Sequence, residues 1–292
     1  MPNPLIDIHY ASVASEPRLF FDWYRTTVDC DYEELRFSLA KEFPLSVWDT
    51  APAIRHFGAG LWLDDGSSHK ICSLYRVPST GRPHVIASGF YSPLVALIVQ
   101  DFQHSVSRVD VATDISGVDL FDVLLSLSRR FCSSRGLNRT VIAPDLPDLG
   151  STIYIGSRAS PVFVRVYQVG LLRAKVEGRT GDDISDLERS AVRVELEYKP
   201  NHRDAKRAVS TLSPSEVVCS AGWASEFFSL VFGTDFHPIV VPKPRNNDRD
   251  KALRHMARQY GRHLTSVMVE VGGDTEAFGS YVWSLVCPPL DV

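Results

Sequence analysis

Three segments of the chain alternate apolar and polar residues with a period of two, which is the pattern of a β-strand with one buried face. They span residues 107–115, 162–167 and 192–198. In each segment one face is mainly aliphatic, and the opposite face holds arginine, carboxylate or aromatic side chains. A sheet with one apolar and one polar face is typical of antiparallel strands. The pattern therefore predicts an antiparallel sheet whose apolar face is covered by the rest of the chain.

Helical segments are interspersed with these strands. Residues 119–135 have an amphipathic pattern that ends at Gly136, a residue that commonly terminates a helix. Residues 16–27, with Pro17 near the start, are predicted to be helical as well. Strands and helices are mixed without a regular βαβ repeat, which favours the α+β class. We expect a central antiparallel sheet with flanking helices.

The polar faces of the three strands converge on one surface if the strands share a sheet. Gathered carboxylate oxygens suit Mg²⁺ or Mn²⁺, and such a cation can polarise a phosphodiester. A tyrosine there can act as a nucleophile, and arginines can hold the flanking phosphates. The surface therefore predicts phosphoryl-transfer chemistry. Its residues are Arg108, Asp110, Asp114, Arg165, Tyr167, Arg193, Glu195 and Glu197.

The same pattern also fits an ordinary solvated sheet face. Arginine–carboxylate pairs across strands stabilise such a face by about 0.2–1 kcal/mol each. A tyrosine on a half-buried strand is usually a packing residue. On the residues alone, a soluble binding protein with a charged sheet face stays open as an alternative to an enzyme.

Charge and motif content exclude several classes of protein. The net charge is -4, so the chain is not a generally basic nucleic-acid coat, and a nucleic-acid site must be a local patch. The sequence contains no G-x-x-x-x-G-K-[ST] loop, which argues against an ATP-driven helicase. Two basic clusters are candidate DNA contacts, although each also fits a solvated helix face. They contain Arg203, Lys206 and Arg207, and then Arg249, Arg254 and Arg258.

The cellular compartment is suggested by what the sequence lacks. Its five cysteines are scattered, without the spacing of a zinc finger or a disulfide framework. The start of the chain has no signal-peptide pattern, and no apolar run is long enough to span a membrane. We expect a soluble, cytoplasmic protein with no membrane partner.

Three motifs occur in a fixed order along the chain. They are R-V-D-V-A-T-D at 108–114, Y-I-G-S-R-A-S at 154–160 running into R-V-Y at 165–167, and R-V-E-L-E at 193–197. A short strand-and-glycine motif, V-I-A-S-G at 85–89, precedes them. The set resembles the replication-initiation-factor family of plasmids and single-stranded phages, the trans-acting class of rolling-circle initiators. The resemblance covers approximately residues 40–210.

The resemblance implies a fold and an activity. The implied fold is related to the histidine-hydrophobe-histidine nucleases but lacks their histidine pair, and none of the nine histidines here forms an H-x-H motif. The implied enzyme nicks and rejoins origin DNA by a metal-assisted tyrosine transesterification with a 5′-phosphotyrosine intermediate. Its implied partners are single-stranded or cruciform origin DNA, a host helicase and a host polymerase, with a homodimer as one possible state.

The family motifs carry roles over to particular residues. The nucleophile lies in the R-x-Y motif, which here is Tyr167. Mg²⁺ or Mn²⁺ is implied on Asp110 and Glu195, with Asp114 and Glu197 as further carboxylates. We expect Arg158 and Arg165 to contact phosphates at the reaction centre. Arg108, Arg193 and the two basic clusters are the expected contacts to the rest of the DNA.

One departure from the family pattern bears on catalysis. Family members commonly have a lysine two residues after the tyrosine, whereas this chain has Val169. Arg173 or Lys175 could replace that lysine, or the chain could be a DNA-binding module that has lost catalysis. Tyr154 is a second candidate nucleophile.

The motifs also suggest how the chain is divided. They lie within residues 84–200, so we expect a catalytic nicking domain over residues 1–212. Residues 213–292 are predicted to be mainly helical, and they either complete that domain or bind DNA.

Overall fold

The computed structural model describes residues 17–54, 57–67, 69–241 and 248–286 of the chain. The chain divides into two compact units, Met1–Lys243 and Pro244–Val292. Each unit is described by itself below.

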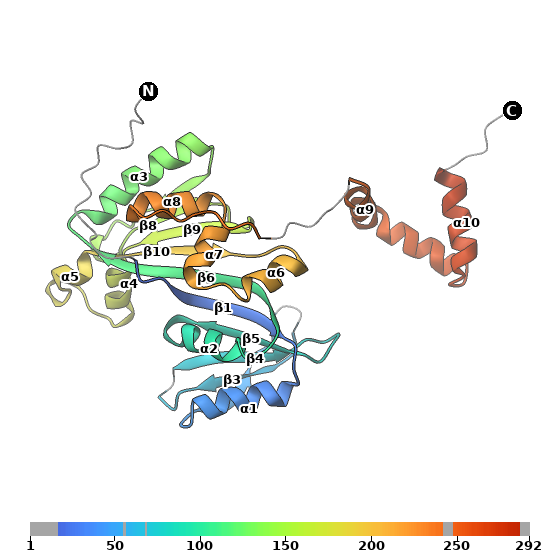
Figure 1. Ribbon diagram of the computed structural model, residues 1–292, viewed down its shortest axis with the longest axis horizontal. Coiled ribbons are helices and arrows are strands. Elements are labelled where there is room, and N and C mark those ends of the chain that lie inside the picture. The colour runs from blue at the N-terminus through green and yellow to red at the C-terminus, as the bar shows by residue number, and fades with distance from the viewer. Residues whose placement is uncertain (1–16, 55–56, 68, 242–247, 287–292) are drawn as a thin grey trace. The chain divides into compact units, whose positions relative to one another are not determined.

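The first unit is built on a ten-stranded sheet in its described part, and every strand pair is antiparallel (Figure 1). The strand order is β2-β3-β4-β5-β1-β6-β10-β9-β8-β7. The central strand β6 pairs with β1 on one side and with β10 on the other. The strands are β1 (Phe20–Val28), β2 (Val47–Ala51), β3 (Gly60–Asp64), β4 (Lys70–Arg76), β5 (Pro83–Ser88), β6 (His104–Ser116), β7 (Arg139–Ile142), β8 (Thr152–Gly156), β9 (Val162–Tyr167) and β10 (Ala191–Tyr198).

One face of the sheet is covered by helices that share its main hydrophobic core. The aliphatic side of β6, β9 and β10 packs there, for example Val111, Val166 and Leu196. The covering helices are α1 (Tyr32–Glu42), α2 (Ser92–Val99), α3 (Leu120–Arg135), α6 (Arg203–Val209), α7 (Pro214–Ser220) and α8 (Trp223–Phe232). Two short helices, α4 (Val169–Val176) and α5 (Asp186–Arg189), connect β9 to β10. The predicted α+β class, with an antiparallel sheet and flanking helices, is confirmed.

The strands with clean alternation agree with the sequence-based expectation. The segment 162–167 is β9, 192–198 lies within β10, and 107–115 lies within β6. The amphipathic segment 119–135 is α3, and its C-cap Gly136 has a φ of 63°, the left-handed conformation that glycine adopts readily.

The helix predicted over residues 16–27 is wrong, because β1 occupies this part of the chain. Phe21, Tyr24 and Val28 are buried, and their spacing of three and four residues imitates a helical stripe. The spacing has another cause here. The pairing of β1 with β6 shifts register between Phe21 and Trp23, where β1 has one extra residue that interrupts its alternation. Beyond that point Tyr24, Thr26 and Val28 alternate as in a regular strand, and all three are buried.

The first unit continues past residue 212, where the sequence suggested a boundary. Helices α7 and α8 contribute Val217, Val218, Phe227 and Phe228 to the main core, so the compact unit runs to Lys243. The second unit contains α9 (Asp248–Glu270) and α10 (Thr275–Val286). Among the described helices, none has both the length and the apolar character needed to cross a membrane.

Candidate active site

The face of the sheet opposite the main core, here called the polar face, carries the charged side chains of β6, β10 and β9. Strand register aligns them in rows. In one row Arg193 lies between Tyr167 and Asp114, and in a parallel row Glu195 lies next to Arg165. The register therefore places eight of the residues selected from the sequence on a single surface. They are Arg108, Asp110, Asp114, Arg165, Tyr167, Arg193, Glu195 and Glu197.

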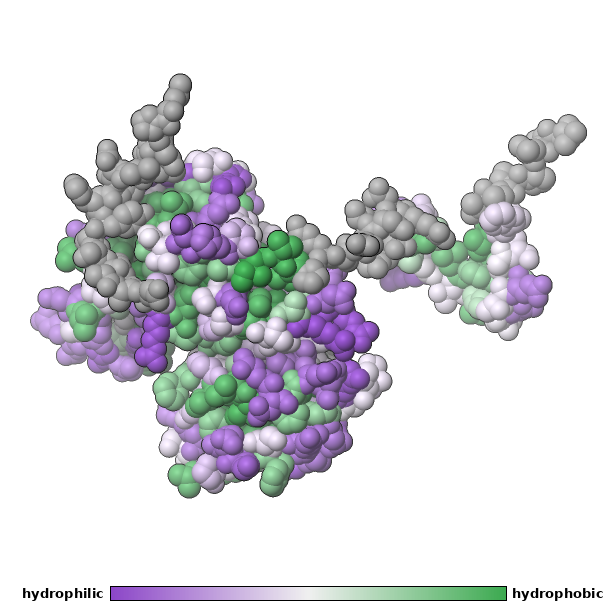
Figure 2. Space-filling view, viewed as in Figure 1, coloured by the Kyte–Doolittle hydropathy of each residue, from purple (hydrophilic) through white to green (hydrophobic). Residues whose placement is uncertain are grey.

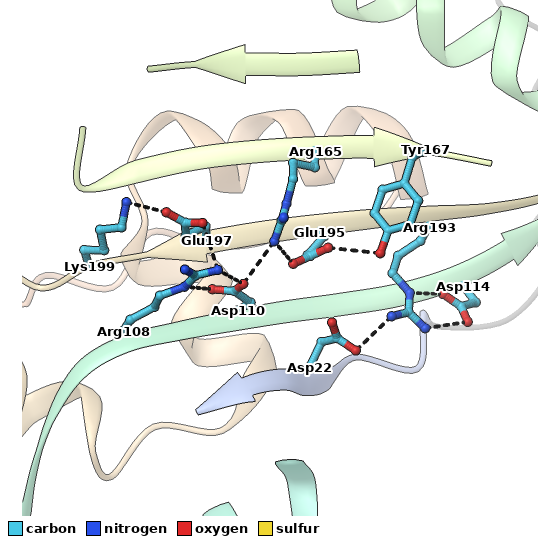
Figure 3. A network of polar contacts seen from close by, with 10 residues as sticks. All are labelled: Asp22, Arg108, Asp110, Asp114, Arg165, Tyr167, Arg193, Glu195, Glu197 and Lys199. Atoms are coloured by element: carbon cyan, nitrogen blue, oxygen red, sulfur yellow. Dashed lines mark hydrogen bonds and ion pairs between the residues drawn. The ribbon is translucent and has the colours of Figure 1, made fainter. Parts of the chain in front are cut away.

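Arg165 is the central cation of this surface (Figure 3). Its Nη2 donates to Oδ2 of Asp110 at 3.1 Å, and it also donates to Oε1 of Glu195. The two carboxylates are buried, with side chains 2% and 3% exposed, whereas the Arg165 side chain is 27% exposed. The guanidinium thus bridges two buried carboxylates and still reaches solvent.

Arg108 extends the same network towards a third carboxylate. Its Nε donates to Asp110 Oδ1 at 2.8 Å, and its Nη2 lies 2.9 Å from Glu197 Oε2. Lys199 forms an ion pair with the other oxygen of Glu197. We use the name polar network for Arg108, Asp110, Arg165, Tyr167, Glu195, Glu197 and Lys199 (Figure 3).

Tyr167 joins the polar network through its hydroxyl, which donates to Oε2 of Glu195 at 3.2 Å. Burial and the negative charge of Glu195 raise the pKa of Tyr167, so the phenol keeps its proton until a base removes it. Burial also raises the pKa of Glu195 to about 7, against the lowering effect of Arg165 and with a further rise from Asp110. Glu195 is therefore placed to accept the proton of Tyr167, and its raised pKa makes it a stronger base than an ordinary carboxylate.

A second cluster lies beside Tyr167 and is centred on Arg193. The Nε of Arg193 donates to Asp114 at 2.6 Å, and its Nη1 donates to Asp22 at 2.8 Å. Arg173 of α4 donates to the other oxygen of Asp114 at 2.7 Å. Burial alone would raise the pKa of Asp114, but the bonds from Arg193 and Arg173 hold it below its ordinary value. The sequence analysis missed Asp22, because β1 was expected to be a helix.

Val169, which stands where family members commonly have a lysine, has an apolar side chain in place of a cationic one. Val169 is buried at the start of α4, next to Gly170. A Cβ on Gly170 would lie 1.9 Å from the backbone oxygen of Glu188, so the close approach of α5 requires glycine there. The cation that α4 supplies to the polar face is Arg173, which pairs with Asp114.

The carboxylates provide the oxygen donors that Mg²⁺ and Mn²⁺ prefer, but in this arrangement arginines already engage them. Arg165 bridges Asp110 and Glu195, where the cation was expected. Within the part of the chain that the structure describes, no group of three or more His, Cys, Asp or Glu side chains is arranged to hold a metal ion. The side chains as placed do not fit a divalent cation, and the use of one stays a prediction.

Arg158 lies outside the polar network, in the turn between β8 and β9. Its guanidinium carbon is 5.2 Å from the ring centroid of Tyr154 and 5.8 Å from that of Phe163. The rings of Tyr154 and Phe163 are stacked, with centroids 5.6 Å apart and an interplanar angle of 16°. Tyr154, the alternative nucleophile, is thus a member of an aromatic pair, whereas the hydroxyl that bonds to Glu195 belongs to Tyr167.

The two basic clusters belong to two different units, and each is described within its own unit. Arg203, Lys206 and Arg207 are on α6, which packs on the helical side of the sheet, and Figure 2 shows the hydrophilic side chains around this helix. The second cluster falls on α9 in the second unit. Its three arginines, Arg249, Arg254 and Arg258, have side chains outside the described part of the structure.

Comparisons with known proteins find a likeness only among solved structures. No protein family and no curated protein matches the sequence. Among solved structures, the chain is similar to a rolling circle replication initiator protein from Geobacillus stearothermophilus, with 15% sequence identity and a TM-score of 0.48. The match covers 70% of this chain and 83% of that chain. These comparisons do not assign the protein to a family.

Proposed function

We propose that the protein nicks and rejoins one strand of an origin of rolling-circle replication, with Tyr167 as the nucleophile. The order of the three sequence motifs supports the class of reaction. The hydrogen bond from Tyr167 to Glu195 is the observation that carries the proposal, because it joins a phenol to a carboxylate of raised pKa on an arginine-rich surface.

The proposed chemistry balances with the side chains on this face. Glu195 Oε2 accepts the phenolic proton of Tyr167, and the phenolate oxygen attacks the phosphorus of the scissile phosphodiester. The bond between phosphorus and the 3′ oxygen breaks, and that oxygen takes up the proton that Glu195 accepted, directly or through water, to become a 3′-hydroxyl. The product is a 5′-phosphotyrosine. Its bond energy is conserved, so attack by a 3′-hydroxyl can reverse the step and close the strand without ATP.

Arginines beside the nucleophile would stabilise the charge that develops on the phosphate oxygens. Arg165 is on the same side of β9 as Tyr167, and Arg193 of β10 lies directly opposite Tyr167 in the strand pair. Both guanidiniums are already oriented by carboxylates, which fixes their planar donors before a phosphate arrives. Phosphate contacts by Arg108 and by the basic cluster on α6 belong to the same proposal.

Metal use is a separate part of the proposal. Asp110 and Glu195, with Asp114 and Glu197 nearby, are the carboxylates on which Mg²⁺ or Mn²⁺ is proposed. When bound, the cation would supply Lewis-acid assistance to the phosphate. Arg165 competes for the same oxygens, so binding of a cation requires Arg165 to release Asp110 and Glu195.

The partners follow from the reaction. A single-stranded or cruciform origin would present the scissile strand, and a host polymerase and helicase would use the free 3′-hydroxyl. A homodimer would allow two copies to act on one origin.

Covalent-adduct formation tests the function. The full chain is incubated with pools of single-stranded oligonucleotides, with Mg²⁺, Mn²⁺ or EDTA, and the products are run on denaturing gels. An adduct in the wild type that is lost in Tyr167→Phe and retained in Tyr154→Phe is expected. An adduct that survives Tyr167→Phe would contradict the assignment of the nucleophile.

A DNA-binding module without catalysis is the second candidate, and Val169 favours it. The expected family lysine is absent, and its position is buried rather than facing the polar network. Such a module would bind origin DNA with a strong dependence on salt, yet it would form no adduct with any oligonucleotide that it binds.

A further inference from the structure

Aromatic side chains flank the polar network on the polar face of the sheet. On one side lies the stacked pair of Tyr154 and Phe163 with Arg158 over it, and on the other lies Trp23 with Arg108 over it. We propose that these are two base-stacking subsites, which hold the bases of single-stranded DNA on either side of the reaction centre. The inference rests on the proposed function in naming DNA as the ligand.

Strand register places the two subsites in one row. Phe163 of β9 lies opposite Glu197, Glu197 lies opposite Asp110, and Asp110 lies opposite Trp23 of β1. Three strand spacings therefore separate Phe163 from Trp23, or about 14 Å. The carboxylates Glu197 and Asp110 occupy the middle of the row, where Arg108 and Arg165 bind them, and aromatic rings stand at its ends. A strand lying across the sheet can place its phosphates over these arginines and its bases over the rings.

The subsite on β8 and β9 combines a ring pair with an exposed arginine that lies over it. Tyr154 is only partly buried and is the neighbour of Arg165 across the strand pair. Phe163 supports its ring from beneath and is itself buried. Arg158 is exposed and lies in a turn, so its side chain can lift away and close over an inserted base. A base held between a guanidinium and an aromatic ring gains both stacking and cation–π attraction.

The subsite on β1 has the same two components. The guanidinium carbon of Arg108 is 4.7 Å from the ring centroid of Trp23, a partly buried residue that packs against the small core cluster of Ala51, Tyr75 and Ile86. Arg108 also binds Asp110 and Glu197, so it connects this subsite directly to the polar network. One arginine can thus contact a phosphate over the network and a base over Trp23.

Single-stranded rather than duplex DNA fits this surface. Bases in a duplex are stacked on one another and paired, so they cannot lie on protein rings, whereas unpaired bases can. Stacking on rings tolerates any base, because every base has a π-face. The subsites would hold the strand in place, and base identity would have to be read elsewhere.

Binding of labelled oligonucleotides tests the inference in the full chain. All variants are made in a Tyr167→Phe background, so that no covalent step contributes. Tyr154→Leu and Trp23→Leu are expected to weaken single-strand binding by roughly 5- to 150-fold each, the size of one lost base–aromatic stack. The matched variants Tyr154→Phe and Trp23→Phe keep a ring and should stay within about twofold of the parent. Duplex of the same sequence should bind more weakly than the single strand.

A second measurement does not depend on the leucine variants and applies where one of them fails to fold. Single-stranded DNA carrying 2-aminopurine at one position at a time is titrated with the otherwise unsubstituted Tyr167→Phe protein. We expect quenching by stacking at two separate positions of the strand, and Arg158→Ala, a change in an exposed turn, should reduce it at one of them. Equal affinities of the leucine and phenylalanine variants, equal affinity for duplex, or an absence of position-specific quenching would overturn the inference.

Failure of this inference and failure of the proposed function give different results. An adduct on Tyr167 together with ring-independent binding removes only the stacking subsites. Ring-dependent binding without any adduct removes the nicking activity and leaves a single-strand-binding surface.

Discussion

The hydroxyl of Tyr167 lies 3.2 Å from Oε2 of Glu195, and the two residues come from the adjacent strands β9 and β10. The same carboxylate accepts a hydrogen bond from Arg165 through its other oxygen. Glu195 is therefore oriented from one side and faces the phenol on the other. Family resemblance implied a metal-binding role for Glu195, and the proposed mechanism gives it a further role as the proton acceptor of Tyr167.

Replacing Glu195 by glutamine should slow adduct formation by about 10²–10⁴-fold, because the amide keeps the shape of the side chain but cannot take the phenolic proton. Glu197→Gln is the matched control, since Glu197 pairs with Arg108 and Lys199 rather than with Tyr167. Single-turnover rates with saturating oligonucleotide measure the effect. Equal losses in both variants would show that the Tyr167–Glu195 contact has no special role.

The rate of adduct formation should rise with pH through about 7, the value to which burial raises the pKa of Glu195. The rate rises rather than falls because Glu195 can accept the phenolic proton only when it is deprotonated. Its raised pKa means that the deprotonated carboxylate becomes abundant only near neutral pH. Because the pKa of Glu195 is raised above its ordinary value of 4.5, its ionisation also lowers folding stability as pH rises from about 4.5 to about 7. Single-turnover rates of adduct formation measured across this pH range test the predicted rise. A Glu195→Gln protein with an unchanged profile would refute the assignment.

Arg165→Met should lower the free energy of unfolding by about 2–4 kcal/mol. The change leaves Asp110 and Glu195 buried without their shared cation, and the estimate lies low in the range for buried pairs because the Arg165 side chain is 27% exposed. Urea denaturation at neutral pH measures the loss. Adding Glu195→Gln should recover part of it, since one of the uncompensated charges is then gone. A neutral single variant would mean that the bridge contributes nothing to stability.

Millimolar Mg²⁺ or Mn²⁺ should raise the thermal midpoint of Arg165→Met more than that of the wild type. Without Arg165, Glu195 loses its bridging cation and Asp110 keeps only Arg108, so both carboxylates become more open to a divalent cation. A ligand that binds only the folded state stabilises it. Asp110→Asn in the Arg165→Met protein should remove the response. The same response in wild type and variant would show that Arg165 and the cation do not compete for these carboxylates.

The sequence was informative where alternation is regular and each strand is straight. The polar residues of β6, β9 and β10 could be selected because a clean period of two separates them from the aliphatic side. The same reasoning failed for β1, because one extra residue at the shift of register between Phe21 and Trp23 disturbs its period, and Asp22 and Trp23 were therefore not recognised as residues of the polar face.

The alternation of residues within one strand also could not predict which side chains of other strands each residue contacts. Which strands pair, and in which register, depends on the packing of the whole sheet, so the contact of Tyr167 with Glu195 and the bridge made by Arg165 required the structure. Arg158 shows the same limit. Its position in a turn suggested a phosphate contact, whereas its guanidinium lies over the rings of Tyr154 and Phe163.

The most direct measurement of the central claim is the identity of the residue that carries DNA. The wild-type protein is reacted with single-stranded oligonucleotide, the adduct is digested with nuclease and protease, and the nucleotide-bearing peptide is sequenced by mass spectrometry. The account predicts a phosphodiester link on Tyr167, in the peptide that contains β9. A nucleotide on Tyr154, or on any residue other than Tyr167, would contradict it.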